Sequence, residues 1–308
     1  MRHNRLLIVC MCFTIGIELF LRMNQDPDDI DFIFEWCFFD RIFERYIHHL
    51  QEGTNQYIPI TINGFRGKDE HFSSEDGLRI IVTGAGHNFA NNVQYGYAWP
   101  EILERKLSEK GIQSEILNRS MNGSTVVFAQ KVLFPEILNN NPTHVILSHS
   151  GYNEAILSYI SDDEIIRPNH ILFNLLMSCE FSRFLYKKLF ISYKKTIPIE
   201  KQHKVGLVEF TKIYEQMISI LIQKNIRVIL LQQEVITPNT HDFWRLEDLD
   251  LYRQSFQKLA QKFGLQLIDP KEFSKHAPEL YFDNQEYYNV KMHAQLADTV
   301  SEIISLTQ

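Results

Sequence analysis

Serine, histidine and carboxylate side chains follow several apolar runs of the sequence, and nucleophilic catalysis needs that combination. A serine hydroxyl attacks a carbonyl when an imidazole takes its proton and a carboxylate orients that imidazole. Such a set can be assembled from Ser124, His87 and Asp283. Other candidates stand near the same runs, namely Thr83, Ser120, Ser148, Ser150, His149, Glu286 and His293. A chain with 12 histidines offers many such combinations, so these residues alone indicate the chemistry only weakly.

The competing interpretation of these residues is structural. His87 is then a loop residue, and Ser148 and Ser150 are hydroxyls that bond to backbone at a strand end. His293 is then a capping residue near the start of the last helix.

Short β-branched runs alternate with amphipathic stretches from residue 79 onward. The runs predict strands at residues 79–83, 114–118, 144–148, 226–231 and 265–268. The amphipathic stretches predict helices at residues 99–107, 124–131, 209–224, 249–263 and 294–306. This alternation is typical of βαβ units and predicts a mostly parallel sheet with helices on both faces. Because ligands bind beyond the carboxyl ends of such strands, functional residues are expected just after Thr83, Asn118, Ser148 and Leu231.

Composition excludes several classes of protein. The 308 residues are 44% hydrophobic and 22% charged, as in ordinary globular domains and unlike disordered, collagen-like or polytopic membrane chains. Lys and Arg number 31 against 38 Asp and Glu, and no basic stripe is visible, so we expect no nucleic-acid partner. The four cysteines show no CxxC or Cys/His ligand spacing, so we expect no disulfide scaffold, no metal and no other cofactor.

The N-terminus carries a targeting signal. Basic residues Arg2 and Arg5 precede an apolar run from Leu6 to Leu21, which is slightly short of the ~20 residues that span a bilayer. No small-x-small cleavage site follows, so residues 1–25 are interpreted as an uncleaved signal anchor. The expected location is the inner membrane, as a single-pass protein whose globular part lies on the periplasmic or extracytoplasmic side. The alternatives are a secreted protein with a cleaved signal and a buried amphipathic helix. Residues 26–75 then form a connecting segment, and residues 76–308 form the globular domain.

Several short motifs, in their order and spacing, resemble the SGNH (GDSL-type) hydrolase superfamily over roughly residues 60 to 306. Residues 84–86 (Gly-Ala-Gly) follow the first strand as Gly-Asp-Ser does in that family, and residues 151–153 (Gly-Tyr-Asn) match its Gly-x-Asn motif. Gly123 matches a glycine whose amide faces the oxyanion. The anchor and residues 62–67 are similar to those of membrane-tethered bacterial members. The resemblance implies a three-layer α/β/α fold with a flavodoxin-like, five-stranded sheet.

The same resemblance places unsuitable residues at the catalytic positions. Gly86 takes the serine position, Asn284 the aspartate position and Tyr287 the histidine position, while His293 matches a second, usually non-catalytic histidine. Glycine has no side chain, and a tyrosine of pKa about 10 is a poor base at pH 7. Tyr287 and Tyr288 are therefore expected to fill the space of the missing imidazole.

Part of an oxyanion hole remains in this correspondence, built from the amides of Gly86 and Gly123 and the side chain of Asn153. Gly123 and Gly151 are equally compatible with simple turn positions.

Two classes of function follow. The favoured one is a catalytically impaired envelope protein that binds an acylated glycan, a lipid or a protein partner at the residual oxyanion pocket. The alternative is an active ester hydrolase or O-acyltransferase on envelope glycan or lipid esters, with His87, Ser124, Asp283 and His293 as substitute residues. Residues 160–204 are rich in Leu, Phe and Tyr and are interpreted as a packed helical pair or as a lid.

Overall fold

The computed structural model describes residues 66–67, 77–90, 92–121, 123–158, 161–165, 202–234, 246–275, 277, 281–283 and 287–306. The expected anchor (1–25), nearly all of the connecting segment (26–75) and most of the stretch 160–204 lie outside these residues, as do Asn284 and Glu286. Among the helices that are described, none combines the length and apolar character needed to cross a membrane.

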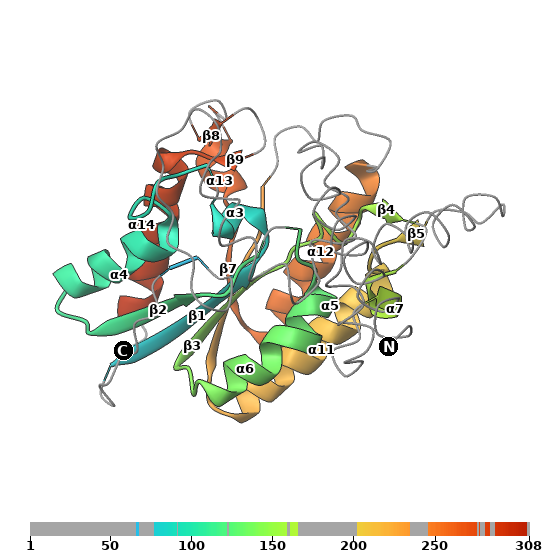
Figure 1. Ribbon diagram of the computed structural model, residues 1–308, viewed down its shortest axis with the longest axis horizontal. Helices are drawn as coiled ribbons and strands as arrows, with labels where there is room; N and C mark the ends of the chain where they lie inside the picture. Colours follow the sequence, from blue (N-terminus) through green and yellow to red (C-terminus); the bar gives the residue numbers. More distant parts are fainter. Residues whose placement is uncertain are drawn as a thin grey trace, which may run out of the picture.

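A five-stranded parallel sheet forms the centre of the domain (Figure 1). It consists of β1 (Leu78–Gly84), β2 (Ser114–Asn118), β3 (His144–Ser148), β6 (Arg227–Leu231) and β7 (Gln266–Ile268), in the order β2-β1-β3-β6-β7. All four neighbouring pairs are parallel. Every residue of β3 is buried, as expected where helices cover both faces of a parallel sheet. All five predicted strands and the predicted fold class are confirmed.

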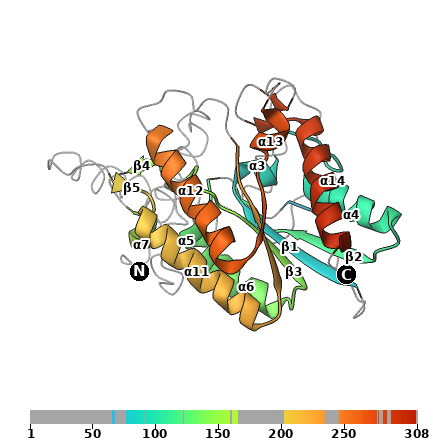
Figure 2. The ribbon, with the colours of Figure 1, turned by 180° about the vertical axis from the view of Figure 1, so that it is seen from behind.

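Two helical layers enclose the sheet (Figures 1 and 2). On one face, Ile80 and Val82 of β1 join a core with α4 (Trp99–Glu109) and α14 (Val290–Leu306). On the other face, Ile81 joins a core with a second set of helices. That set is α5 (Val126–Phe128), a π-helical turn η1 (Ala129–Leu133), α6 (Phe134–Asn139), α11 (Leu207–Gln223) and α12 (Leu246–Phe263). Alternate residues of one strand thus fill two separate cores.

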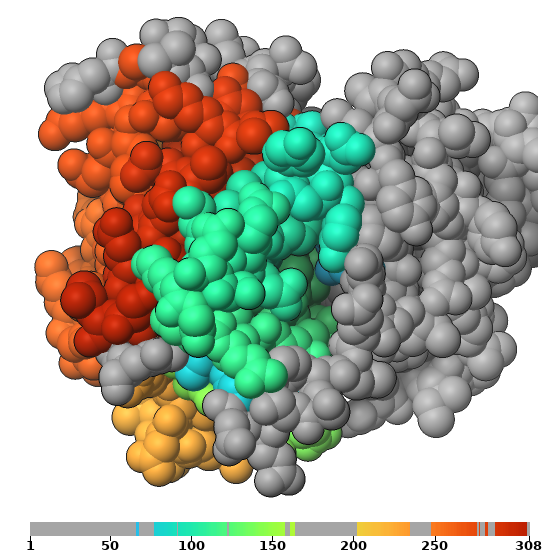
Figure 3. All heavy atoms as spheres, turned by 90° about the vertical axis from the view of Figure 1, so that its left-hand side faces the viewer, coloured from blue at the N-terminus to red at the C-terminus, as the bar shows by residue number. Residues whose placement is uncertain are grey.

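The observed helices coincide with the predicted ones but begin and end elsewhere. The helix expected at 294–306 begins at Val290, because Asn289 Oδ1 accepts the amides of Lys291 (3.0 Å) and Met292 (3.1 Å) and so caps the helix. The helix expected at 124–131 begins at Val126 and continues through η1 and α6. Helix α14 lies beside α4 on the surface, where Lys106 and Asp298 form an ion pair (Figure 3).

Short elements that the sequence analysis did not predict gather where the strands end. Helix α3 (Gly86–Phe89), α13 (Lys271–Ser274) and the pair β8 (Phe282–Asp283) and β9 (Tyr287–Tyr288) lie at the top in Figure 1, beyond the end of β1. Strands β4 (Leu157–Ser158) and β5 (Gln202–His203) pair beside α7 (Asp162–Ile165). We call the end of the sheet where β1, β3 and β6 finish the carboxyl edge.

Candidate functional site

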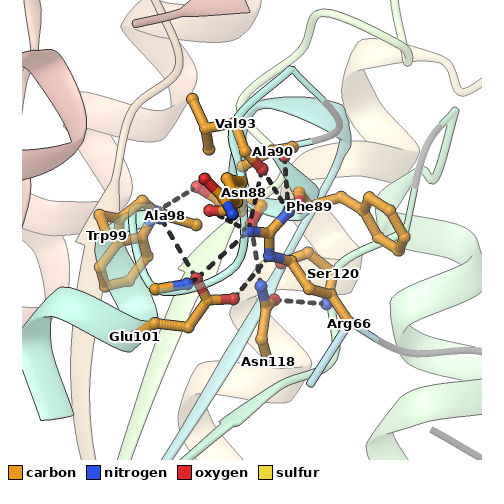
Figure 4. Close-up of polar contacts among 12 residues, drawn as sticks. Arg66, Asn88, Phe89, Ala90, Val93, Ala98, Trp99, Glu101, Asn118 and Ser120 are labelled. Carbon is orange, nitrogen blue, oxygen red and sulfur yellow. Dashed lines mark hydrogen bonds and ion pairs between the residues drawn. The ribbon is translucent and has the colours of Figure 1, made fainter. Parts of the chain in front are cut away.

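The turn after β1 is packed too tightly to admit a side chain at Gly84. A Cβ there would lie 2.1 Å from Asn88 Nδ2 and 3.2 Å from the Cβ of Ser148. Asn88 approaches this closely because it is held at two atoms: its Oδ1 accepts the indole N–H of Trp99 (3.0 Å), and its backbone carbonyl accepts Asn118 Nδ2 (2.9 Å). These contacts fix α3, which begins at Gly86, against the ends of β1 and β2 (Figure 4).

Arg66 holds the rest of the loop that follows α3. Its side chain is fully buried, and its guanidinium donates to backbone carbonyls of Phe89, Ala90, Val93 and Gln94 (Figure 4). Its Nε lies 2.6 Å from Glu101 Oε1, and Glu101 Oε2 accepts the amide of Gly96 (2.8 Å). Arg66 was expected only as part of the motif at residues 62–67. The sequence does not show which groups surround its side chain, because the carbonyls that it binds lie 23 to 28 residues further along the chain.

His87 lies among aromatic rings and is not the partner of Ser124. Its ring centroid is 4.8 Å from Tyr288, 5.7 Å from Tyr152 and 6.0 Å from Tyr287. The turn at residues 84–86, the Gly-Tyr-Asn motif at residues 151–153 and the last motif, which contains Tyr287, therefore meet at His87. The side chain of Asp283, the third member of the set first assembled, lies outside the described part of the chain.

The two tyrosines of β9 differ. Tyr288 fills the interior as expected: it is buried, its hydroxyl accepts the amide of Glu234 (2.8 Å), and burial raises its pKa well above the ordinary value. Tyr287 is 39% exposed, so it packs on His87 while keeping one side open to solvent.

The imidazole beside Ser124 is His149, at the end of β3. Ser124 Oγ lies 2.9 Å from His149 Nε2 and donates its proton to the carbonyl of Gly84 at 2.7 Å. A hydroxyl has one proton, so while Ser124 donates it to Gly84, His149 carries its hydrogen on Nε2 and donates to the serine; when that proton turns to His149, Nε2 accepts it and Nδ1 carries the hydrogen. His149 Nδ1 is buried and has no hydrogen bond to a described residue, and burial lowers the pKa of the ring to about 3. The imidazole is therefore neutral.

Of the expected oxyanion hole, Gly86 begins α3, whereas Gly123 and Asn153 stand on two adjoining loops, the second of which also carries Gly151. Gly123 has φ +67°, and Gly151 has φ +110°, where a Cβ would lie 2.2 Å from Tyr252 Cβ. Both glycines therefore stand at backbone positions that favour glycine, as the turn interpretation expects. Asn153 Nδ2 donates to the carbonyl of Ser124 at 2.8 Å, so one amide proton binds the neighbouring loop.

His293 has the structural position that the sequence analysis favoured. Its Nδ1 accepts the amide of Trp99 (3.3 Å), which joins the first turns of α4 and α14. Its pKa is lowered to about 3, mainly by burial, with smaller contributions from the charges of Arg66 and His87. A neutral, fully buried ring of this kind is a packing element and a hydrogen-bond acceptor.

Polar side-chain atoms without hydrogen bonds gather around the carboxyl edge. Native proteins leave few buried polar atoms unpaired, and such atoms are normally satisfied by protein, ligand or water. Among the described residues, seven of them lie at the carboxyl ends of β1 and β3 or in the segments that follow the strands of the sheet, namely Thr83 Oγ1, Asn88 Nδ2, Ser120 Oγ, Ser148 Oγ, His149 Nδ1, Gln232 Oε1 and Gln233 Nε2. Both hydroxyls and amides are represented, so this region suits an uncharged oxygen-rich group.

No cluster of three or more His, Cys, Asp or Glu side chains within the described ranges could hold a metal ion.

Glu154 was not among the expected site residues, although it directly follows the Gly-Tyr-Asn motif, and it is 1% exposed. Its position beside that motif was a usable signal, whereas its burial was not visible in the sequence.

Many solved structures resemble this fold, and two of them are described by name. The acetyl xylan esterase AlAXEase superimposes with a TM-score of 0.51 at 16% identity, covering 74% of this chain and 100% of its own. The lipase/acylhydrolase from Enterococcus faecalis gives 0.50 at 14% identity, covering 74% of this chain and 95% of its own. The chain has the SGNH hydrolase fold.

At sequence identities this low, the similarity shows that the chains share the SGNH fold and nothing more. The sequence matches no protein-family model and no curated protein.

Proposed function

We propose that this SGNH-fold protein is a catalytically impaired envelope protein that binds a ligand bearing an acyl ester at the carboxyl edge of its sheet. The observation that carries the proposal is the contact between Ser124 and His149. A general base must present an unprotonated nitrogen to the hydroxyl. His149 instead presents an N–H, because the proton of Ser124 is donated to Gly84.

Two further features support impaired catalysis. A catalytic imidazole is oriented by a carboxylate on its second nitrogen, whereas none of the described residues forms a hydrogen bond with His149 Nδ1. At the position that the family resemblance assigns to the nucleophile, Gly86 has no side chain, and Tyr287 packs beside it on His87. A catalytic triad at the family's positions would need three replaced residues, at Gly86, Asn284 and Tyr287.

The proposed ligand class comes from chemistry near the edge. Hydroxyl and amide groups around β1 and β3 suit carbonyl and hydroxyl oxygens rather than a free charge. The two similar structures are named as an acetyl xylan esterase and a lipase/acylhydrolase, and both names concern acyl esters. We therefore propose an acylated glycan or lipid as the ligand. If neither an acylated glycan nor an acylated lipid binds, we expect a protein partner at the same edge.

A fluorophosphonate probe and a binding titration test the proposal together. The full chain should remain unlabelled by the probe, and calorimetry should show binding to an acetylated xylo-oligosaccharide or to ester-lipid micelles. The deacetylated oligosaccharide should bind at least tenfold more weakly. Failure of both ligands would reject the ligand class, whereas labelling that disappears in Ser124→Ala would reject impaired catalysis.

An active ester hydrolase or acyltransferase is the second candidate, because Ser124 and His149 are already within hydrogen-bond distance at 2.9 Å. Activity would require the Ser124 proton to turn from Gly84 to His149 and the His149 proton to move to Nδ1. The fluorophosphonate experiment separates the two candidates directly.

We also propose that residues 1–25 anchor the protein in the inner membrane with the SGNH domain outside the cytoplasm. The basic start, the apolar run to Leu21 and the acidic residues that follow support this orientation. After fractionation, the full-length chain should sediment with membranes and be accessible to protease in spheroplasts. Recovery in the soluble periplasmic fraction would indicate a cleaved signal instead.

A further inference from the structure

Glu154 connects the two loops that carry Gly123 and Asn153. Its Oε1 accepts the amide of Val126 (2.8 Å), and its Oε2 accepts the amide of Gly151 (3.1 Å). Val126 is the first residue of α5. One buried side chain therefore binds backbone on both sides of the proposed ligand site.

A second connection runs parallel to the first. Thr125, beside Val126, donates its hydroxyl to Asp162 of α7 at 2.5 Å, and Asn153 donates to Ser124. The backbone carbonyl of Glu154 accepts the amide of Val205 (3.2 Å). Because Thr125 is fully buried and Asp162 is 4% exposed, these contacts are shielded from solvent.

We propose that Glu154 is a positioning residue that clamps the Gly123 loop to the Gly151–Asn153 loop while it is protonated and loosens both loops when it ionises. The clamp goes beyond the proposed function, and its relevance to a ligand rests on that function. Because hydrogen exchange is measured without a ligand, the clamp and the proposed ligand binding can be rejected independently.

The surroundings of Glu154 explain why a proton controls it. The pKa of Glu154 is raised from 4.5 to about 7: burial is the largest cause and the negative charge of Asp162 adds to it, while hydrogen bonds from the backbone amides of Glu154 itself, Val126 and Gly151 act in the opposite direction. Charged and titratable groups stand on every element packed around Glu154 and its neighbour Asp162. They are Asp162 and Asp163 on α7, Lys131 on η1, Lys204 after β5, Glu209 and Tyr214 on α11, and Asp248 and Tyr252 on α12. The two lysines act on Asp162, and both tyrosines stay neutral.

The direction of the effect follows from linkage. When the loops separate, Glu154 enters water and its pKa returns toward 4.5, so the open state holds its proton less tightly than the closed state. Opening is therefore suppressed below pH 4.5 and becomes easier as pH rises to about 7. Above that pH the ease of opening stays constant.

Hydrogen exchange of the full chain, measured by mass spectrometry from pH 5 to pH 8, tests the clamp. After correction for intrinsic exchange rates, protection of peptides covering residues 121–128 and 149–156 should fall at least tenfold between pH 5 and pH 7.5. In Glu154→Gln, which is neutral at every pH, this dependence should disappear. Asp162→Asn should keep the dependence and move its midpoint to lower pH.

Glu115→Gln is the matched control, because Glu115 is also buried but pairs with Arg79 near the start of β1, away from the carboxyl edge. It should leave the pH dependence of both peptides unchanged. If the wild type shows no pH dependence, or if Glu154→Gln keeps it, the clamp is rejected. If Glu154 had a structural role alone, Glu154→Gln would lower protection by the same factor at every pH. The wild-type series would then show no pH dependence.

Discussion

Arg66 and Glu101 form an ion pair with 2.6 Å between Nε and Oε1, although 35 residues separate them; the Arg66 side chain is fully buried and that of Glu101 is mostly buried. The pair joins a residue that precedes the sheet to the first turn of α4. Because Arg66 also satisfies backbone carbonyls after α3, it determines the shape of the loop beside Gly86. The architecture of the site thus depends on a residue that is outside both the sheet and the helical layers.

Replacement of Arg66 should accordingly destabilise the protein. Arg66→Ala leaves Glu101 and several carbonyls without their partner, and breaking a buried ion pair on one side costs about 3–5 kcal/mol. Arg66→Lys should recover only part of this loss, because an ammonium group cannot reproduce the planar fork. Urea unfolding of the full chain gives the measurement. Arg105→Ala, at an exposed position, is the control and should change stability by less than about 0.5 kcal/mol.

Gly86→Ser alone should not create esterase activity. The new hydroxyl would stand next to His87, but His87 packs among Tyr152, Tyr287 and Tyr288, and the family's histidine position is Tyr287. Hydrolysis of p-nitrophenyl acetate by the variant should remain within about twofold of the wild type. Strong turnover by this single variant would show that a base is already positioned there.

Gly151→Ala should be strongly destabilising, although the change adds one methyl group. The backbone has φ +110°, and the added Cβ would lie 2.2 Å from Tyr252 Cβ, an atom close to the α12 backbone. Strain and overpacking together predict a loss of about 3 kcal/mol or more. Gly206→Ala is the matched control, because it has ordinary φ and nothing within 4 Å. A thermal melt of Gly151→Ala equal to that of the control would contradict this prediction.

The sheet could be predicted from sequence, whereas the site could be predicted only in outline. Strands such as β3 are continuous apolar runs, and that pattern is a local property. The expected proximity of the motifs was also correct, since residues of three motifs meet at His87. Hydrogen-bond partners were not predictable, because His149 and His87 both stand near strand ends and only packing decides which ring reaches Ser124.

The buried histidines predict how stability changes in acid. The pKa values of His149 and His293 are lowered to about 3 and that of His144 to about 4, chiefly by burial. Below pH 6.5 the unfolded chain therefore binds protons that the folded chain does not, and stability falls as pH decreases toward 4. Each histidine contributes up to about 1.4 kcal/mol per pH unit in this range.

The variant His293→Asn separates one of these contributions. Its amide oxygen can replace Nδ1 as the acceptor for Trp99, but it does not titrate. In urea unfolding between pH 6 and pH 4, the stability of His293→Asn should decline less steeply than that of the wild type, by about 1.4 kcal/mol per pH unit. Glu154→Gln should have the opposite effect and steepen the decline above pH 4.5, because Glu154 takes up a proton in the folded state over the same range. Parallel slopes for the wild type and His293→Asn would mean that the ring of His293 is protonated in the folded protein.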